Sequence, residues 1–196
     1  AKKIIACSKG VAKSLSDSGV SKDKIKVITN CVNTSDKKNY HVKVQGNMLS
    51  KKDELKIITV GSLTPQKNHI LFIKLIFELN KIGIDCSAGI IGEGEMRGDI
   101  ESKISELNLS SKVTLFGWQN YVEYYNILSD HNIFVLTSNF EGLPLAILEA
   151  MSIGLPIIST DCESGPREIL SGGKYGVLVP MKDSPALVKA IIKVKK

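Results

Sequence analysis

The stretch IFVLTSNFEGLPLAILEAMSIGLPIIS, residues 133–159, contains the pattern from which the fold can be predicted. Its two ends, IFVL and PIIS, are nearly continuous apolar runs, which are typical of strands buried on both faces of a sheet. The segment between them, residues 145–153, has the apolar spacing of a helix. Glu149, Gly154 and Pro156 divide the long apolar stretch into pieces that are too short to cross a bilayer. We therefore predict a strand, a helix and a second strand, and not a membrane span.

The same alternation extends from Leu55 to the end of the chain. Apolar runs predict six strands, at residues 56–60, 87–91, 113–116, 133–136, 156–159 and 177–179. Helical patterns follow them, at residues 68–81, 95–107, 121–128, 145–153, 167–170 and 184–194. This order predicts an α/β fold, a Rossmann-like doubly wound parallel sheet with helices on both faces. The default strand order for such a sheet is 3-2-1-4-5-6.

The residues before Leu55 contain a shorter version of the pattern. An apolar run at 3–6, a helical pattern at 11–18 and a second apolar run at 25–28 predict a strand, a helix and a strand. Residues 30–50 are polar and have little periodicity, so we interpret them as a linker.

Composition and charge exclude several classes of function. The net charge of +6 comes from 26 basic and 20 acidic residues, and the lysines are scattered, which indicates a solvated surface and no nucleic-acid partner. The four cysteines form no C-x-x-C pair and the three histidines form no metal-spaced pair. We expect no metal site, and the widely spaced cysteines favour a reducing cytoplasm. We expect Cys86 to lie in the core, and each histidine to be structural or exposed.

The predicted strand order points to a binding crevice. Ligands of such sheets bind beyond the carboxyl ends of the first and fourth strands. The loops there, GSLTPQK at residues 61–67 and TSNFEGLP at 137–144, should face the same crevice. Gly61 permits a tight exit from the first strand. Lys67 lies near a helix start, where a cation is disfavoured, and an anionic ligand bound there would compensate its charge. The alternative to a ligand site is an exposed lysine whose ammonium points to water.

Two glutamates stand eight residues apart after the fourth strand. Glu149 lies in an otherwise apolar helix, where burying a carboxylate without partners is costly and sugar hydroxyls would be good partners. The alternatives are a glutamate at the solvent edge or one that backbone donors satisfy. Glu141 lies before the helix, where an acidic residue is favourable in any case. Gly142 lets the backbone approach a ligand, and Pro144 suits the first helical turn, whose free N–H groups can hold phosphate oxygens.

Three further stretches carry weaker signals. Residues 92–94, Gly-Glu-Gly, follow the second strand and do not complete a G-x-G-x-x-G motif, so a plain turn is favoured over a phosphate contact. The loop 162–166 after the fifth strand could line the same crevice. Trp118 follows the third strand and could stack on a base or cover the core.

Together these residues resemble the carboxyl half of a family 4 retaining glycosyltransferase of the GT-B fold, in the class called glycosyl transferases group 1. The stretches that carry the resemblance are ITVGSLTPQKNH, FGW, TSNFEGLPLAILEAMSIGLPIISTDCESGPREIL and GVLVP, and the spacing of Glu141 and Glu149 is the hallmark of that family. The opening residues resemble the end of the amino-terminal domain and the crossing into the hinge. The resemblance therefore implies a remnant and hinge at residues 1–54 and a nucleotide-sugar-binding domain at 55–196. Since the first residue is Ala1, it also implies a piece of a longer protein.

The resemblance implies roles for individual residues. Glu149 would bind the ribose hydroxyls and Glu141 the donor sugar near its 3-hydroxyl. Lys67 would neutralise the leaving diphosphate in place of a metal, so Glu141 and Lys67 are the implied catalytic residues and no cofactor is expected. The remaining implied donor contacts are Gly61, Ser62, Gly117, Trp118, Gly142, Leu143, Pro144, Leu145 and Arg167, with Gly117 and Trp118 beside the base.

One departure from the family pattern bears on the donor site. Ser62 stands where the family often has arginine, so half of the usual cationic clamp is missing and Arg167 is the candidate that would help Lys67. The surrounding SGPREIL is similar to transferases that build cell-surface polysaccharides from UDP-linked hexoses or N-acetylhexosamines.

The implied function is transfer of a hexosyl or N-acetylhexosaminyl group, with retention, from a UDP-sugar to a hydroxyl of a sugar or lipid-linked sugar. The acceptor would bind through the amino-terminal domain, so we expect the chain alone to bind donor weakly and to be inactive. The setting implied is cytoplasmic, at the inner face of the cell membrane if the full-length enzyme associates with it peripherally. Two alternatives remain, a GT-B sugar-nucleotide epimerase and a non-catalytic Rossmann-type nucleotide-binding module.

Overall fold

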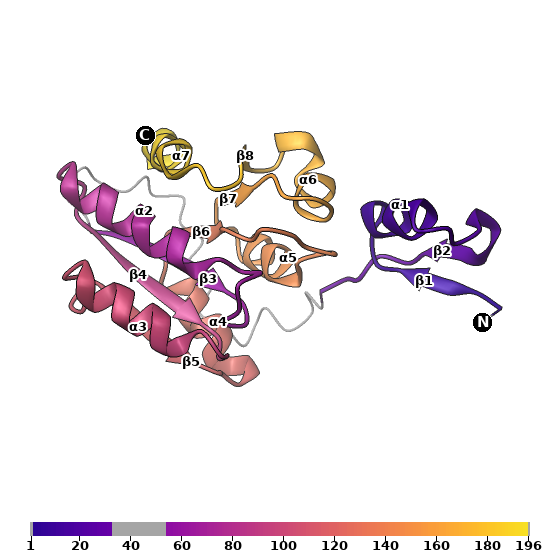
Figure 1. Cartoon of the computed structure of the whole chain (residues 1–196). Helices are drawn as coiled ribbons and strands as arrows, with labels where there is room; N and C mark the ends of the chain where they lie inside the picture. The colour runs from indigo at the N-terminus through magenta and orange to yellow at the C-terminus, as the bar shows by residue number, and fades with distance from the viewer. Residues whose placement is uncertain (1, 33–53, 196) are drawn as a thin grey trace.

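The computed structural model describes residues 2–32 and 54–195, and its main body is a six-stranded parallel sheet (Figure 1). The strand order is β5-β4-β3-β6-β7-β8, which is the predicted order 3-2-1-4-5-6. The strands are β3 (Leu55–Val60), β4 (Cys86–Ile91), β5 (Val113–Gly117), β6 (Ile133–Leu136), β7 (Ile157–Thr160) and β8 (Val177–Val179). The doubly wound α/β prediction is confirmed.

Helices cover both faces of this sheet, as the continuous apolar strands require. The helices are α2 (His69–Lys81), α3 (Arg97–Glu106), α4 (Tyr121–Ser129), α5 (Leu145–Ser152), α6 (Pro166–Ile169) and α7 (Ser184–Lys195). Ile57 of β3 packs in one core with α2, α3 and α7. Its neighbour Ile58 packs in the other core with α4 and α5, because successive side chains of a strand point to opposite faces. Cys86 is fully buried in the first core, as predicted.

A smaller unit precedes the large sheet. It consists of β1 (Ile4–Ala6), α1 (Lys9–Asp17) and β2 (Ile25–Val27), and its two strands pair in parallel. The predicted strand–helix–strand pattern is therefore confirmed. Residues 33–50 of the predicted linker lie outside the described residues, so the division of the chain between residues 54 and 55 stays a prediction.

The small unit touches the large one at the loops that follow β6 and β7 (Figure 1). The backbone N–H of Lys9 donates to the Glu168 carboxylate, at 2.9 and 3.3 Å from its two oxygens. Gly10 lies so close to Ser164 that a Cβ at Gly10 would be 2.4 Å from the Ser164 hydroxyl oxygen. The start of α1 therefore packs against the loops at the carboxyl ends of the parallel strands.

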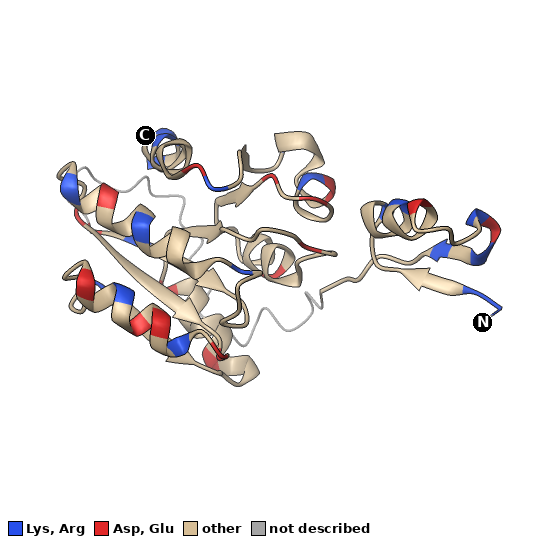
Figure 2. Ribbon diagram, in the orientation of Figure 1, with Lys and Arg blue, Asp and Glu red and all other residues tan. Residues whose placement is uncertain are grey.

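Charged residues are interspersed over the helices, with basic and acidic side chains on the same elements (Figure 2). Several of them form exposed pairs, such as Arg97 with Glu101 on α3. Such pairs contribute little to stability, which fits the interpretation of a solvated surface. Across residues 2–32 and 54–195, none of the helices has the length and apolarity that a bilayer crossing would need.

Candidate functional site

The loops that follow β3 and β6 are joined by hydrogen bonds, because these two strands are neighbours in the sheet. The Thr137 hydroxyl donates to the carbonyl oxygens of Lys67 and Asn68, both at 3.1 Å. The backbone N–H of Asn139 donates to the Gln66 carbonyl at 2.8 Å, and the Gln66 amide donates to the Phe140 carbonyl at 3.0 Å. The two loops therefore meet, as the strand order predicts, and the binding crevice between them stays a prediction.

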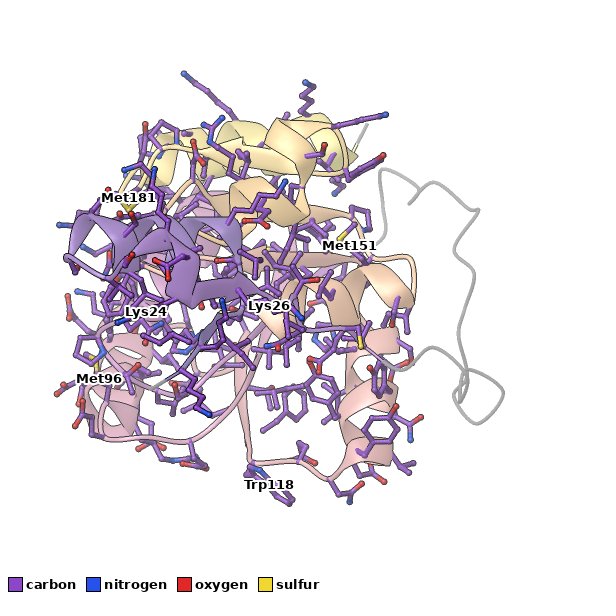
Figure 3. All side chains as sticks on the ribbon, turned by 90° about the vertical axis from the view of Figure 1, so that its right-hand side faces the viewer. Lys24, Lys26, Met96, Trp118, Met151 and Met181 are labelled. Atoms are coloured by element: carbon purple, nitrogen blue, oxygen red, sulfur yellow. The ribbon has the colours of Figure 1, made fainter. Side chains whose placement is uncertain are left out.

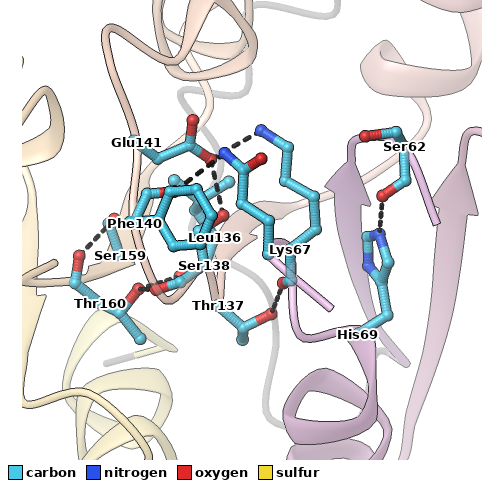
Figure 4. A network of polar contacts seen from close by, with 11 residues as sticks. Ser62, Lys67, His69, Leu136, Thr137, Ser138, Phe140, Glu141, Ser159 and Thr160 are labelled. Atoms are coloured by element: carbon cyan, nitrogen blue, oxygen red, sulfur yellow. Dashed lines mark hydrogen bonds and ion pairs between the residues drawn. The ribbon is translucent and has the colours of Figure 1, made fainter. Parts of the chain in front are cut away.

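An ion pair between Lys67 and Glu141 lies at this junction (Figure 4). The Lys67 ammonium is 2.6 Å from Oε1 of Glu141, and the Ser138 hydroxyl donates to the same oxygen at 2.6 Å. The Lys67 side chain is only 17% exposed and that of Glu141 only 5% exposed. Lys67 therefore does not simply point to water, and its charge is compensated by a carboxylate of the other loop.

Gly61 does not provide the tight turn after the first strand that the sequence suggested. It is not among the glycines with positive φ, so its backbone does not require glycine. A Cβ at Gly61 would instead lie about 3.0 Å from the Lys67 side chain. The missing side chain at Gly61 leaves room for the aliphatic part of Lys67, which carries the ammonium to Glu141.

The start of α2 is fixed by a buried histidine. His69 is 2% exposed, and its Nε2 lies 3.3 Å from the carbonyl oxygen of Ser62. Burial lowers the pKa of His69 to about 4, so the ring is neutral at pH 7 and can donate to that carbonyl. His69 is structural, as predicted, and it holds the loop in which Ser62 has an exposed side chain.

Glu149 has a partner that the sequence analysis missed. It is partly buried on α5, and its Oε2 accepts a hydrogen bond from the Tyr124 hydroxyl on α4. Burial and then the charge of Glu149 raise the pKa of Tyr124 well above its usual range, so the hydroxyl keeps its proton and donates. The sequence pattern did not indicate this contact, because Tyr124 and Glu149 lie on different helices and the pattern within each helix does not show which side chains meet between them.

The segment from Gly142 to Leu145 leads into α5. Pro144 occupies the position that caps the helix, with φ −69° and ψ 101°, and α5 begins at Leu145. The proline therefore directly precedes the helix, which begins at Leu145 as predicted. Gly142 faces the small unit, because a Cβ there would lie 3.4 Å from the Cys7 sulfur.

Arg167 does not join the Lys67–Glu141 pair in this structure. Its guanidinium pairs with Asp161, which follows β7, and its Nε lies 3.0 Å from the Asp161 carboxylate. Its side chain is 64% exposed. An additional role for Arg167 beside Lys67 would require it to leave Asp161.

The end of β5 presents an exposed tryptophan. Trp118 is 77% exposed and projects from the body of the molecule (Figure 3), so it does not cover the core. Gly117 before it has a φ of +71°. Gly92, in the weak Gly-Glu-Gly motif, has a φ of +147°, and a Cβ there would lie 2.0 Å from the Gly61 carbonyl oxygen. The motif therefore serves close packing between the loops after β3 and β4.

The structure brings Lys67 and Glu141 together at the loop junction, and it places Glu149 on the helix that follows, in contact with Tyr124. Lys67 can pair with an anion, and each carboxylate can accept hydrogen bonds from hydroxyl groups. Across the described ranges, no cluster of three or more His, Cys, Asp or Glu side chains has the arrangement needed to hold a metal ion.

Comparisons with known proteins place this site in a family. The chain is 36% identical over 148 residues to the UDP-Gal:alpha-D-GlcNAc-diphosphoundecaprenol alpha-1,3-galactosyltransferase of Escherichia coli, covering 74% of this chain and 37% of that protein. It is also 36% identical over 140 residues to an uncharacterized glycosyltransferase of Methanocaldococcus jannaschii, covering 65% of this chain and 34% of that protein. The chain thus spans about a third of the length of these curated relatives.

Solved structures show the same architecture. The lipopolysaccharide outer core galactosyltransferase WaaB superposes with a TM-score of 0.78 at 27% identity, covering 99% of this chain and 53% of that one. Anabaena HepE, solved with UDP and glucose, superposes with a TM-score of 0.83 at 18% identity, covering 98% of this chain and 53% of that one, which shows a shared fold. The family model described as "Glycosyl transferases group 1" matches residues 43–196. The chain therefore belongs to the glycosyl transferases group 1 family.

Proposed function

We propose that this chain is the donor-binding half of a retaining glycosyltransferase. The enzyme would move a hexosyl or N-acetylhexosaminyl group from a UDP-sugar to a hydroxyl acceptor in the synthesis of a cell-surface polysaccharide or glycolipid. The observation that carries the proposal is the buried Lys67–Glu141 pair, located where the loops after β3 and β6 meet. The similarity to known transferases supports the substrate class, since the E. coli relative is named as a UDP-galactose-dependent transferase that acts on a lipid-linked sugar.

The donor diphosphate would bind between Lys67 and the start of α5. Lys67 would turn from Glu141 to the phosphate oxygens and neutralise the leaving group without a metal. The free N–H groups at the start of α5 add donors for the same anion, with the exception of Pro144, which has no N–H. Gly142 and Leu143 would contribute backbone groups before the helix.

The two carboxylates would recognise the sugar rings of the donor. Glu141 would accept a hydrogen bond from the transferred sugar, near its 3-hydroxyl, and Glu149 would accept from the ribose. Trp118 is exposed next to Gly117 and is available to border the base by stacking. Gly61 and Ser62 complete the first loop beside Lys67.

The reaction would proceed on one face of the donor sugar. The acceptor oxygen would form a bond to the anomeric carbon as the bond from that carbon to the phosphate oxygen breaks. The acceptor proton would pass to the leaving phosphate. The acceptor, a sugar or a lipid-linked sugar, would be bound outside this chain, so the chain alone would bind donor weakly and would not transfer sugar. We place the enzyme in the cytoplasm, with the full-length protein peripheral to the inner face of the membrane.

Calorimetric and thermal-shift measurements on the chain test the proposal. UDP should raise the melting temperature more than GDP or ADP at the same concentration, because a ligand that binds more tightly stabilises the folded state more. Glu149→Ala should weaken UDP binding by about tenfold or more, as expected for lost hydrogen bonds to a charged group. The control Glu101→Ala removes an exposed carboxylate on α3 and should leave UDP affinity unchanged. Equal UDP affinity in the unaltered chain and Glu149→Ala would contradict the assigned role. Efficient sugar transfer by the chain alone would refute the expected inactivity.

A further inference from the structure

The hydrogen bond between Tyr124 and Glu149 joins two helices at the candidate donor site. Tyr124 lies on α4, which follows β5, and Glu149 lies on α5, which follows β6. Both side chains are partly buried, and the bond uses only one of the two carboxylate oxygens, Oε2. A carboxylate has about four lone-pair sites, so the remaining oxygen of Glu149 keeps its capacity to accept.

The tyrosine ring is itself held in place by its neighbours. Its centroid lies 5.2 Å from that of Tyr125, with the two rings perpendicular. Tyr125 is 4% exposed and belongs to the core beneath α4 and α5. A ring packed against a core side chain has few alternative rotamers, so the position of the Tyr124 hydroxyl is fixed by the core. The hydroxyl in turn restricts the rotamers of the Glu149 carboxylate.

The chemical type of the Tyr124 side chain also affects how Glu149 could bind a ligand. A lysine or arginine at this position would neutralise Glu149 and compete for both of its oxygens. A neutral phenol donates one hydrogen bond and leaves the negative charge on the carboxylate. Because the environment keeps the phenol protonated, the direction of the bond is fixed, with Tyr124 as donor and Glu149 as acceptor.

We infer that Tyr124 is a positioning residue for ribose recognition, holding the Glu149 carboxylate so that Oε1 accepts from the ribose hydroxyls of the donor. The inference rests on the proposed function, because it assigns a second residue to the ribose contact made by Glu149. It goes beyond that proposal by naming a residue that does not itself touch the ligand and acts only through Glu149.

The test compares UDP with 2′,3′-dideoxy-UDP, which lacks the ribose hydroxyls. Affinities are measured by titration calorimetry, or by ligand-observed NMR where binding is millimolar. The unaltered chain should prefer UDP by about tenfold or more, as expected for hydrogen bonds to a charged group. In Tyr124→Phe this preference should fall by about three- to tenfold, while the affinity for dideoxy-UDP stays the same. A general disturbance of the fold would lower both affinities together. Tyr175→Phe removes a hydroxyl from an exposed tyrosine and serves as the matched control, with an unchanged preference.

The double variant Tyr124→Phe/Glu149→Ala provides a second measurement, and it removes both partners so that neither is left unpaired. Its affinity for UDP should equal that of Glu149→Ala alone, since Tyr124 has no route to the ribose once Glu149 is gone. A further loss in the double variant, or an unchanged preference in Tyr124→Phe, would overturn the inference while leaving the role of Glu149 intact. If the unaltered chain does not prefer UDP over dideoxy-UDP, the ribose role of Glu149 fails first and the inference fails with it.

Discussion

The Lys67–Glu141 pair gives the sharpest quantitative prediction, because the two partners differ in how well each could survive without the other. The Glu141 side chain is 5% exposed and the Lys67 side chain 17% exposed. Lys67→Met keeps an unbranched side chain over Gly61 but leaves a buried carboxylate whose remaining described contact is the Ser138 hydroxyl. Removing one partner of a buried pair typically costs about 3–5 kcal/mol, and we expect that loss of unfolding free energy here.

Glu141→Gln should cost less. The glutamine keeps an oxygen that can accept from Ser138, and the lysine has a flexible chain that can extend its ammonium toward water. We expect a loss of about 1.5–3 kcal/mol, the usual contribution of a hydrogen bond to a charged group. In the double variant no charge is left without a partner, so its stability should equal that of Glu141→Gln. The coupling energy between the two positions is then about 3 kcal/mol or more.

The assay is urea unfolding of the unaltered chain, the two single variants and the double variant. The slope of the unfolding free energy against urea concentration should be the same in all four proteins. The exposed pair Arg97–Glu101 on α3 is the control, for which the same cycle should give a coupling below about 1 kcal/mol. If the effects of Lys67→Met and Glu141→Gln add within about 0.5 kcal/mol, the two charges do not depend on one another and the reasoning is wrong.

Two further predictions follow from the loops around this pair. Since the pKa of His69 is about 4 in the folded protein and about 6.5 when unfolded, the unfolded chain binds more protons between these values. The unfolding free energy should therefore fall by about 3 kcal/mol as the pH drops from about 6.5 to about 4. In His69→Gln this contribution to the pH dependence should be missing. If urea unfolding shows that the unfolding free energy changes with pH equally in His69→Gln and in the unaltered chain, the prediction is wrong. Gly92→Ala should cost more than about 3 kcal/mol, because its φ is +147° and the new Cβ would meet a backbone carbonyl at 2.0 Å. The control Gly98→Ala, where the Cβ meets open space on α3, should be neutral or stabilising, and comparable losses in both variants would show that the close approach at Gly92 is not responsible.

The sheet could be predicted because its strands are buried on both faces. Runs such as IITV, residues 57–60, and IFVL, residues 133–136, have no polar alternation, and each is followed by a helical pattern. Right-handed crossovers then leave few possible orders, and the observed order is the default one. The meeting of the two loops that contain Lys67 and Glu141 follows from that order alone.

The side-chain geometry within the site could not be predicted in the same way. Whether Lys67 points to water or to Glu141 depends on rotamers, and these depend on Gly61 and Ser138, which are separated from each other by many residues in the sequence. The Tyr124–Glu149 contact depends on how α4 and α5 pack across one face of the sheet. A pattern of apolar residues shows which side of a helix is buried, but it does not show which polar atom meets which on the neighbouring helix.

The charge balance of these residues bears on the proposal that the chain binds a sugar nucleotide. Lys67, Glu141 and Glu149 together have a formal charge of −1, and Ser62 adds no cation. In the proposed complex, a diphosphate that draws Lys67 away would leave Glu141 buried with the hydroxyl of Ser138, which costs free energy. A donor sugar whose hydroxyl then donates to Glu141 removes that cost. In this proposal, once the ion pair opens, the lysine and the glutamate would both regain a partner only when diphosphate and sugar arrive in one molecule, so the pair would favour the complete donor.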